Sequence, residues 1–319
     1  MNEVNHVMGN NVHSLIFSHI LDNFHRYGRF DHKVSPQPLK PNNMIYLHHR
    51  INKSESIPEN SVAFVHHDLE DFDVSLSTDQ FLSRYSKCSG IICLNTNQKA
   101  FIENELGINN SIVIPHGYSY SHKDVFETVL KQRKSKGYFR MGAYKKISLM
   151  VSSRRYLRGV KGEGTLYQLA KDLDPEIFEF VFIGKDRHLD QIFFQKCGFD
   201  CYSINPISYK DTLGIYASVD ILLNLSWHEG GPANLPEAIK LSVPTLSRNI
   251  GMATDLLSSH FYFTSYKVLL DKLNRWSLDS VFREETMNNI FESNKKIFSS
   301  LDVTLKVEEF LYGCSKWQK

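Results

Sequence analysis

Short apolar runs recur along the chain, and segments with helical periodicity separate them. Apolar runs of strand length that alternate with helix-like segments are typical of βαβ units, whose parallel strands are buried on both faces of the sheet. The alternation therefore predicts an α/β protein built on parallel sheets. No internal repeat is visible in the sequence.

The alternation falls into two series. In the first series, strands are expected at residues 44–47, 62–66, 90–94 and 111–115, and helices near 12–24 and 98–106. The second series is more regular, with strands expected at residues 147–151, 179–183, 200–204, 220–225 and 244–247, and helices near 164–173, 209–217 and 235–240. Apolar side chains at helical spacing over residues 281–311 predict terminal helices that pack on the body.

Residues 131–146, KQRKSKGYFRMGAYKK, interrupt the apolar rhythm between the two series. Basic residues and glycines in such a run are typical of a solvated linker, and contact with a phosphate-rich partner or a membrane surface is the alternative. We therefore expect an N-terminal domain over residues 1–130, a basic linker over 131–146, a C-terminal domain over 147–300 and a helix over 301–319 that packs back on the body.

The composition is that of a soluble globular protein. Of the 319 residues, 42% are hydrophobic and 23% are charged, and the formal net charge is +2. A charge this small provides no global field for nucleic acid. No apolar run approaches the roughly 18 residues of a membrane span, and the first residues lack the basic and apolar regions of a signal peptide. We therefore expect a cytoplasmic protein, in which the five cysteines are reduced.

The common catalytic fingerprints are missing from the sequence. No GxGxxG follows a predicted strand, and neither GxxxxGK[ST], GxSxG nor HExxH occurs. Two histidine pairs, His48 with His49 and His66 with His67, suggest metal ligands. Neighbouring strand residues point to opposite faces, however, so neither pair can easily aim both rings at one ion. We therefore expect no metal site.

The segment 220–246, DILLNLSWHEGGPANLPEAIKLSVPTL, is the most informative part of the chain. Glu229, Gly230 and Gly231 follow a predicted strand at the carboxyl edge, where open α/β sheets place their ligands, and the glycines let backbone amides approach a bound molecule. Asn234 can cap the next helix, whose N-terminus favours an anion such as a diphosphate. Glu237 either contacts the ligand or forms a capping box with Asn234. A phosphate pocket is therefore predicted at this edge.

Several motifs outside and inside this segment form a specific combination. Within it, Ser-x-x-Glu-Gly spans residues 226–230, Glu-Ala follows at 237–238 and Val-Pro at 243–244. The others are Ser152-Ser153-Arg154-Arg155 followed by Lys161-Gly162, then Phe182-Ile183-Gly184, Ile114-Pro115-His116-Gly117 and Val65-His66-His67-Asp68-Leu69. The combination resembles the retaining glycosyltransferases of family 4, over about residues 60 to 260.

The sequence departs from the family pattern at three places. Ser152 replaces the glycine that precedes the arginine, and Ser242 stands where the family usually has a glycine before Val-Pro. The N-terminal half is short and lacks the glycine-rich loop that often follows the first strand, of which Gly9-Asn10-Asn11 is the nearest counterpart.

The resemblance implies the GT-B fold, in which two Rossmann-like domains face a cleft. The N-terminal domain would then lie on the acceptor side, and the C-terminal domain would bind a nucleotide sugar. The resemblance further implies that Arg155 and Lys161 bind the donor diphosphate, with Arg154 as the alternative to Arg155. His67 would line the acceptor side, with His66 as its alternative.

The same resemblance assigns roles around the donor. Gly184 would lie beside the nucleotide, the helix that begins at Asn234 would face the diphosphate, and Glu237 would accept hydrogen bonds from the ribose hydroxyls. Glu229 and the amides of Gly230 and Gly231 would hold the transferred sugar near its anomeric carbon. Glu229 would there help to position the sugar and stabilise developing positive charge.

The implied reaction is transfer of a glycosyl group with retention, by front-face attack in which the leaving phosphate receives the acceptor proton. The substrates would be a nucleotide sugar and a glycan or lipid-linked glycan, in surface polysaccharide biosynthesis. No cofactor, metal or nucleic acid is expected, whereas residues 131–146 are a candidate for peripheral contact with the inner face of a membrane. The alternatives are a non-catalytic partner subunit, and a nucleotide-sugar epimerase or phosphorylase of the same fold.

Overall fold

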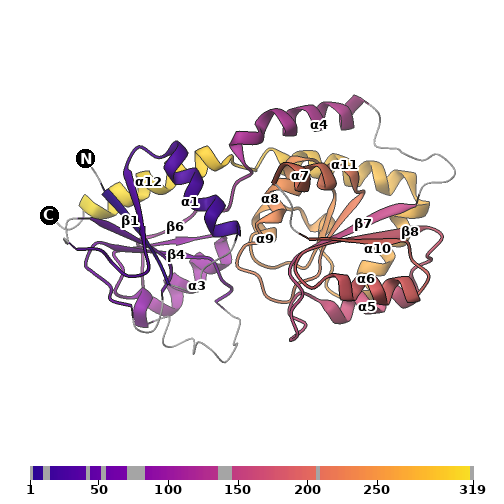
Figure 1. The fold of residues 1–319 in the computed structure, drawn as a ribbon, viewed down its shortest axis with the longest axis horizontal. Helices are drawn as coiled ribbons and strands as arrows, with labels where there is room; N and C mark the ends of the chain where they lie inside the picture. The colour runs from indigo at the N-terminus through magenta and orange to yellow at the C-terminus, as the bar shows by residue number, and fades with distance from the viewer. Residues whose placement is uncertain are drawn as a thin grey trace. The chain divides into compact units, whose positions relative to one another are not determined.

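The structure, a computed structural model, describes residues 3–9, 15–40, 44–51, 55–69, 83–135, 146–205 and 209–316. The chain divides into two compact units (Figure 1). Unit 1 comprises Met1–Tyr120, Glu229–Ala233 and Phe298–Lys319, and unit 2 comprises Ser121–His228 and Asn234–Ile297.

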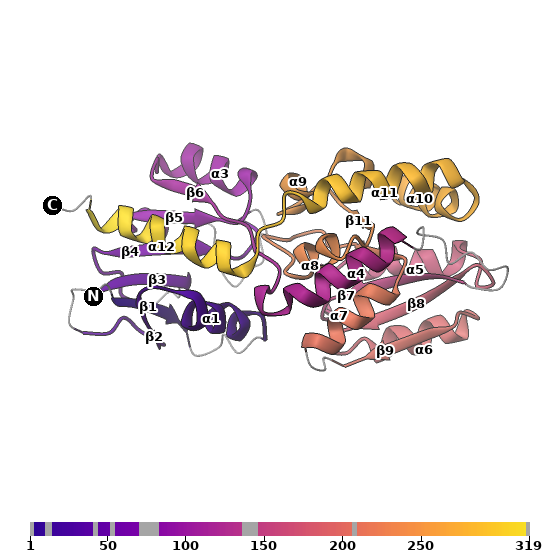
Figure 2. The same ribbon diagram turned by 90° about the horizontal axis from the view of Figure 1, so that it is seen from above.

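Within the described residues, unit 1 is built on a six-stranded sheet of order β2-β1-β3-β4-β5-β6, in which the neighbouring strands pair in parallel. Helices α1 and α12 lie side by side on one face of this sheet, and α3 covers the other (Figures 1 and 2). The elements are β1 (Glu3–Met8), α1 (Leu15–Tyr27), β2 (Asp31–Ser35), β3 (Ile45–Arg50), β4 (Ser61–Val65), β5 (Gly90–Cys93), α3 (Thr96–Leu106), β6 (Ser111–Val113) and α12 (Ser300–Lys316).

Local chemistry sets the ends of α3. The side chain of Asn95 accepts a hydrogen bond from the backbone N–H of Gln98 at 2.9 Å, which caps the helix N-terminus. Gly107 ends the helix in the left-handed conformation, with φ of 64°. On the opposite face, α12 approaches β5 so closely that a Cβ on Gly90 would lie 2.6 Å from the Sγ of Cys314.

The described part of unit 2 contains a five-stranded parallel sheet of order β11-β10-β7-β8-β9. Helices α5 and α6 lie on one face of this sheet, and α7 and α8 lie on the other (Figure 1). The elements are α4 (Lys123–Ser135), β7 (Ile147–Ser152), α5 (Glu163–Asp172), β8 (Phe178–Ile183), α6 (His188–Lys196), β9 (Cys201–Ile204), α7 (Tyr209–Ser218), β10 (Ile221–Asn224), α8 (Asn234–Lys240), β11 (Thr245–Ser247), α9 (Ala253–Leu256), α10 (Tyr266–Leu278) and α11 (Ser280–Asn294).

The strand order of unit 2 is that of a doubly wound sheet. The chain leaves β7 toward β8 and β9 on one side, and it later returns to β10 and β11 on the other. The direction of winding therefore reverses between β7 and β10. In open α/β sheets a ligand binds beside the carboxyl ends of the strands at such a switch point.

The predicted strands of both series are present, but β1, β2, α4, α6, α9 and α10 were not predicted. Strand β1 was missed because Asn5 and His6 interrupt its apolar run, although both side chains are fully buried. Strand β2, DHKVS, is a polar edge strand with little apolar pattern.

The basic segment 131–146 is described only at its two ends. Residues 131–135 form the last part of α4, and Lys146 forms an ion pair of 2.7 Å with Asp200. Residues 136–145, with most of the expected linker and membrane contact, lie outside the described residues, as do Asn10 and Asn11 of the expected loop remnant. In the described ranges no helix combines the length and apolarity that crossing a bilayer requires.

Candidate active site

The carboxyl ends of three strands meet at the switch point of unit 2. The side-chain amide of Asn234, at the start of α8, donates a 2.8 Å hydrogen bond to the carbonyl of Ser152 at the end of β7. The backbone N–H of Trp227, just after β10, donates to the carbonyl of Val160 at 2.8 Å. The loops that follow β7 and β10 are thereby joined, and Asn234 connects strand β7 with helix α8.

Two glycines allow these loops to pack closely. Gly162 has φ of 79°, and a Cβ there would lie 2.2 Å from the carbonyl oxygen of Leu225. Gly184, after β8, has φ of 138°, and its Cβ would lie 2.4 Å from the carbonyl oxygen of Ser153. Both positions therefore need glycine for conformation and for space.

Replacing Gly162 by alanine is expected to lower the free energy of unfolding by about 2 to 4 kcal/mol, because the new methyl group meets backbone in a left-handed conformation. Urea denaturation measures this loss. Gly164→Ala is the matched control, because a Cβ at this helical position has no neighbour within 4 Å. Equal stability of the two variants would show that the loops are not packed as described.

Two cations of the loop after β7 share one aromatic ring. The guanidinium of Arg154 lies 5.1 Å from the ring centroid of Tyr156, and the ammonium of Lys161 lies 5.8 Å from the same centroid. Both distances are in the range of cation–π contacts. Arg154 is exposed and Lys161 is half-buried, so the loop presents two positive charges near the switch point.

Arg155 has different partners from its neighbour Arg154. Its Nε lies 3.3 Å from Oδ1 of Asp190, and its Nη2 donates to the hydroxyl of Tyr167 at 3.1 Å. The Tyr167 hydroxyl in turn donates to Asp190 at 2.7 Å. The described contacts of Arg155 therefore join this loop to helices α5 and α6.

A buried ionic network supports the loop after β7 that carries Arg154 and Lys161, which we name the cation loop. The side chains of Arg187 and Asp190 are fully buried and form a 2.7 Å ion pair. Arg187 also donates from Nε to the carbonyl of Ser153 and from Nη2 to its hydroxyl, each at 2.8 Å. Glu163 accepts from the backbone N–H groups of Tyr156 at 3.0 Å and of Lys161 at 3.1 Å. The network therefore fixes the backbone at both ends of the loop. The sequence analysis missed Arg187, because nothing in an isolated arginine after a strand signals its burial.

Glu237 is a buried carboxyl group on α8. It accepts a hydrogen bond from the hydroxyl of Tyr209 on α7. Burial raises the pKa of Glu237 to about 7, and the bond from Tyr209 opposes this rise in pKa. The described contact thus runs across to another helix and not back to the helix start, as a capping box would require.

The raised pKa of Glu237 makes the stability of the fold depend on pH. The folded state holds the proton of this carboxyl more tightly than the unfolded state does, so stability is highest below the unfolded pKa and is lost as pH rises toward 7. We expect the free energy of unfolding of the wild type to include a loss of about 3 kcal/mol from Glu237 as pH rises from 4 to 8. This loss should be absent in Glu237→Gln. Urea denaturation of both proteins across this range measures it, and a difference between them that stays constant with pH would contradict the expectation.

Glu229, Gly230 and Gly231 group with unit 1, where Gly230 packs against the backbone of His67. The side-chain amide of Asn95 donates to the carbonyl of Gly230 at 2.9 Å, and a Cβ on Gly230 would lie 2.6 Å from the backbone of His67. Glu229 and Gly231 are half-buried. The structure therefore brings these residues to His67, whereas Arg154, Lys161, Gly184, Asn234 and Glu237 are gathered in unit 2.

The two histidines after β4 have different surroundings. The ring of His67 stacks near that of Tyr85, a core residue, with centroids 6.2 Å apart. The Nε2 of His66 lies 3.1 Å from Nδ1 of His49, and its ring stacks on that of His116 at 5.4 Å. His116 therefore belongs to a histidine cluster with His49 and His66.

The other predicted pair also separates. His48 contacts Glu55 and the hydroxyl of Ser61, whereas His49 contacts His66 and a histidine of β1. Over the residues that the structure describes, no group of three His, Cys, Asp or Glu side chains is arranged to hold a metal ion.

Comparison with known proteins establishes the fold. No protein-family model and no curated protein matches the sequence. Anabaena Alr3699/HepE, solved with UDP and glucose, matches with a TM-score of 0.70 and 13% identity over 98% of this chain and 100% of its own. Sucrose-phosphate synthase from Thermosynechococcus elongatus matches with a TM-score of 0.69 and 10% identity over 98% and 99% of the two chains.

A third match is the lipopolysaccharide outer core galactosyltransferase WaaB, with a TM-score of 0.67 and 14% identity over 98% and 99% of the two chains. Each of these proteins is similar to the chain in structure at low sequence identity. The comparisons therefore confirm the predicted GT-B fold. At these identities they establish the fold alone.

Proposed function

We propose that the chain is a retaining glycosyltransferase that moves a sugar from a nucleotide-sugar donor to a glycan or lipid-linked glycan acceptor. The proposal rests chiefly on the pair of cations, Arg154 and Lys161, that the Tyr156 ring gathers at the switch point of unit 2. The likeness to HepE, which was solved with UDP and glucose, and to the galactosyltransferase WaaB supports it. WaaG, a glycosyltransferase involved in lipopolysaccharide biosynthesis, is a further structural neighbour and supports a role in surface polysaccharide assembly.

On the donor side, Arg154 and Lys161 would neutralise the charge that develops on the leaving diphosphate. We assign this role to Arg154 in preference to Arg155, because the guanidinium of Arg155 already contacts Asp190 and Tyr167. A guanidinium can bind two phosphate oxygens at once, and the ammonium acts as a point charge.

The nucleoside would lie against unit 2. Gly184, which packs against the backbone of Ser153, would lie beside the nucleoside at the end of β8. The ionised carboxylate of Glu237 would accept hydrogen bonds from the ribose hydroxyls in place of the one from Tyr209. Asn234 would hold α8 in position through its bond to Ser152.

On the sugar and acceptor side, Glu229 and the amides of Gly230 and Gly231 would hold the transferred sugar. We assign the acceptor-side role to His66 in preference to His67, because the ring of His67 packs against the core residue Tyr85. In the reaction, the bond from the anomeric carbon to the diphosphate oxygen breaks, and a bond to the acceptor oxygen forms on the same face. The acceptor proton passes to the leaving phosphate, so no separate protein base is required.

The proposal is tested first by donor binding. The chain is heated with UDP, GDP, ADP, CMP and dTDP sugars in turn, and a donor at 100 times its Kd is expected to add about 2.7 kcal/mol to the free energy of unfolding. Lys161→Ala is the test variant for this stabilisation. Lys171→Ala is its matched control, because Lys171 is exposed in the last turn of α5 and away from the loop after β7. Silence with every donor would contradict a competent donor site.

The stabilising donor is then incubated with glycan acceptors, and NMR of the product reads the anomeric configuration. Retention is the expected result, and inversion would overturn the proposed mechanism. Turnover without acceptor, or dependence on free phosphate, would instead identify an epimerase or a phosphorylase.

A non-catalytic partner subunit is not favoured by the two serines that depart from the family pattern. The hydroxyl of Ser152 lies 2.7 Å from that of Tyr216. Ser242 has φ of 56°, the left-handed conformation in which glycine is ordinarily preferred, and the side-chain amide of Asn294 lies 3.4 Å from its hydroxyl. Both serines are therefore accommodated without any change in the cation loop.

A further inference from the structure

A line of hydrogen-bonded side chains crosses four adjacent strands of unit 1. Oε1 of Glu308 on α12 lies 2.9 Å from Nε2 of His32 on β2. Nδ1 of His32 lies 2.8 Å from Nε2 of His6 on β1, and Nδ1 of His6 lies 2.8 Å from Nε2 of His49 on β3. Nδ1 of His49 lies 3.1 Å from Nε2 of His66, which directly follows β4. We name these five residues the histidine relay.

The fold places the members of the histidine relay in line. The strand order β2-β1-β3-β4 makes their strands neighbours. The pairing of β1 with β3 shifts register between Val7 and Met8, so that His49 is the extra residue of a bulge. At the other end, a Cβ on Gly28 would lie 2.3 Å from Nε2 of His32 and 2.8 Å from Oε1 of Glu308.

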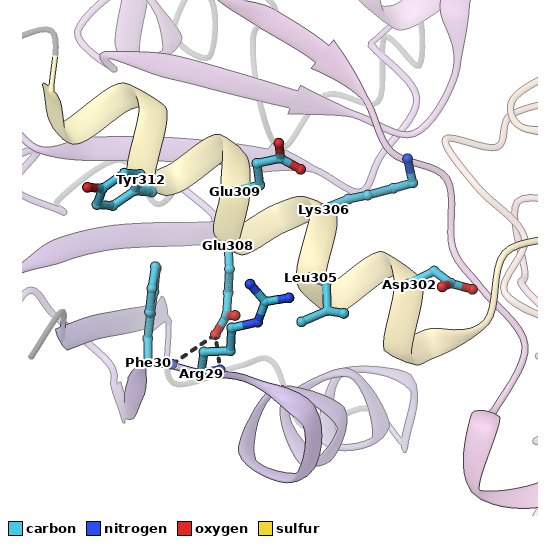
Figure 3. A pocket seen from close by; sticks show the side chains of 8 residues that line it. All are labelled: Arg29, Phe30, Asp302, Leu305, Lys306, Glu308, Glu309 and Tyr312. Atoms are coloured by element: carbon cyan, nitrogen blue, oxygen red, sulfur yellow. Dashed lines mark hydrogen bonds between the residues drawn. The ribbon is translucent and has the colours of Figure 1, made fainter.

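Glu308 gives the relay a direction. Its Oε1 accepts hydrogen bonds from the backbone N–H groups of Arg29 at 2.7 Å and Phe30 at 3.0 Å (Figure 3). These residues line a hollow of about 490 Å³ along α12. Backbone N–H groups can only donate, so this oxygen is an acceptor. The contact with His32 therefore requires a proton on Nε2 of His32.

The direction passes along the whole line, because a neutral imidazole has one donor and one acceptor nitrogen. With its proton on Nε2, His32 accepts at Nδ1 and thereby fixes the proton of His6 on Nε2. The same step repeats at His49 and then at His66. Burial lowers the pKa of His32, although Glu308 opposes this shift. Burial also holds the pKa of His6 and His66 well below the ordinary value and lowers that of His49 to about 3, so the four rings are neutral.

We propose that Glu308 sets the tautomer of His66 through the histidine relay, so that His66 offers a bare Nδ1 as hydrogen-bond acceptor to a hydroxyl of the ligand on this side of unit 1. His66 is half-buried, and its ring stacks on that of His116. Glu308, His32, His6 and His49 are positioning residues that act through His66. Identification of the hydroxyl as that of the acceptor glycan rests on the proposed function, whereas the tautomer does not.

The tautomer is read by NMR of the full chain labelled with ¹⁵N-histidine, in which protonated and bare ring nitrogens have distinct shifts. In the wild type, His66 is expected to carry its proton on Nε2. In Glu308→Leu the Nε2–H of His32 would face an apolar side chain, and in His32→Phe the Nε2–H of His6 would do so. A buried donor that lacks an acceptor costs about 1 to 3 kcal/mol. The line is therefore expected to reverse, which places the proton of His66 mainly on Nδ1.

Glu308→Gln is the conservative variant, because its amide oxygen still accepts from the same partners, and it is expected to keep the wild-type tautomer. His25→Gln is the control for a nearby substitution, because His25 is exposed and its ring lies 6.3 Å from that of His32 without a hydrogen bond between them. His32→Phe leaves the bonds of Glu308 to backbone intact, so it serves where Glu308→Leu does not fold. A bare Nδ1 on His66 in folded His32→Phe, or a protonated one in the wild type, would overturn the proposal.

Kinetics separate this proposal from the proposed function. In His32→Phe, kcat/KM for the acceptor is expected to fall about five- to tenfold, the effect of one neutral hydrogen bond, with donor affinity unchanged. A reversed tautomer with unchanged acceptor kinetics would remove the ligand role of Nδ1. Absence of transfer in the wild type, with the expected tautomers present, would count against the proposed function and leave the relay standing.

Discussion

Lys161→Ala is expected to lower the rate of glycosyl transfer by roughly 10²- to 10³-fold, by analogy with the loss of one donor to a developing anion. The ammonium of Lys161 lies beside the Tyr156 ring in a loop whose backbone Glu163 holds, so its charge is already in place before the donor binds. The rate is measured under saturating donor and acceptor, which separates a loss in kcat from a loss in binding.

The control for this result is charge removal elsewhere in unit 2. Lys171→Ala removes the same charge at the far end of α5, and its rate is expected to remain that of the wild type. Arg154→Ala is expected to weaken donor binding, whereas Arg155→Ala is expected to act mainly on stability, because Arg155 contacts Asp190 and Tyr167. A wild-type rate in Lys161→Ala would remove this residue from the proposed site.

Arg187→Met is expected to lower the free energy of unfolding by about 3 to 5 kcal/mol, because it removes the close, buried ion-pair partner of the Asp190 carboxylate and leaves only the 3.3 Å contact with Arg155. The loss also frees the carbonyl and hydroxyl of Ser153, to which Arg187 donates. Urea denaturation measures the effect. The slope of the free energy of unfolding against urea concentration is expected to equal that of the wild type.

The double variant Arg187→Met with Asp190→Leu tests the cause. If the uncompensated charge is responsible, removing it should recover most of the stability lost in the single variant. A double variant no more stable than Arg187→Met would show that the bonds to Ser153, and not the buried charge, account for the loss.

The core of unit 2 follows from the sequence because most residues of its buried strands are apolar. Strands β8 and β10, FEFVFI and ILLN, are read directly from their composition. Strand β1 could not be read in this way. Its two polar residues are buried because partners on other strands satisfy them, His6 through His32 and His49, and Asn5 through a 2.8 Å bond to Ser35.

The candidate site shows the same division. The motifs placed Lys161, Gly184 and Glu237 near the ends of the right strands, because those positions follow strands that the pattern reveals. The choice between Arg154 and Arg155 was open, since adjacent loop residues differ only in which distant side chains they meet. Our proposal favours Arg154 because Arg155 contacts Asp190 and Tyr167, and these contacts depend on the packing of α5 and α6.

The proposed diphosphate site at the switch point of unit 2 can be tested by calorimetric titration with paired nucleotides. UDP, GDP, ADP and dTDP are each compared with the matching monophosphate. We predict that one diphosphate binds at least about tenfold more tightly than its monophosphate, and that this preference disappears when Arg154 and Lys161 are both replaced by alanine. Equal affinity for the two nucleotides in the wild type, or an undiminished preference in the double variant, would contradict the account.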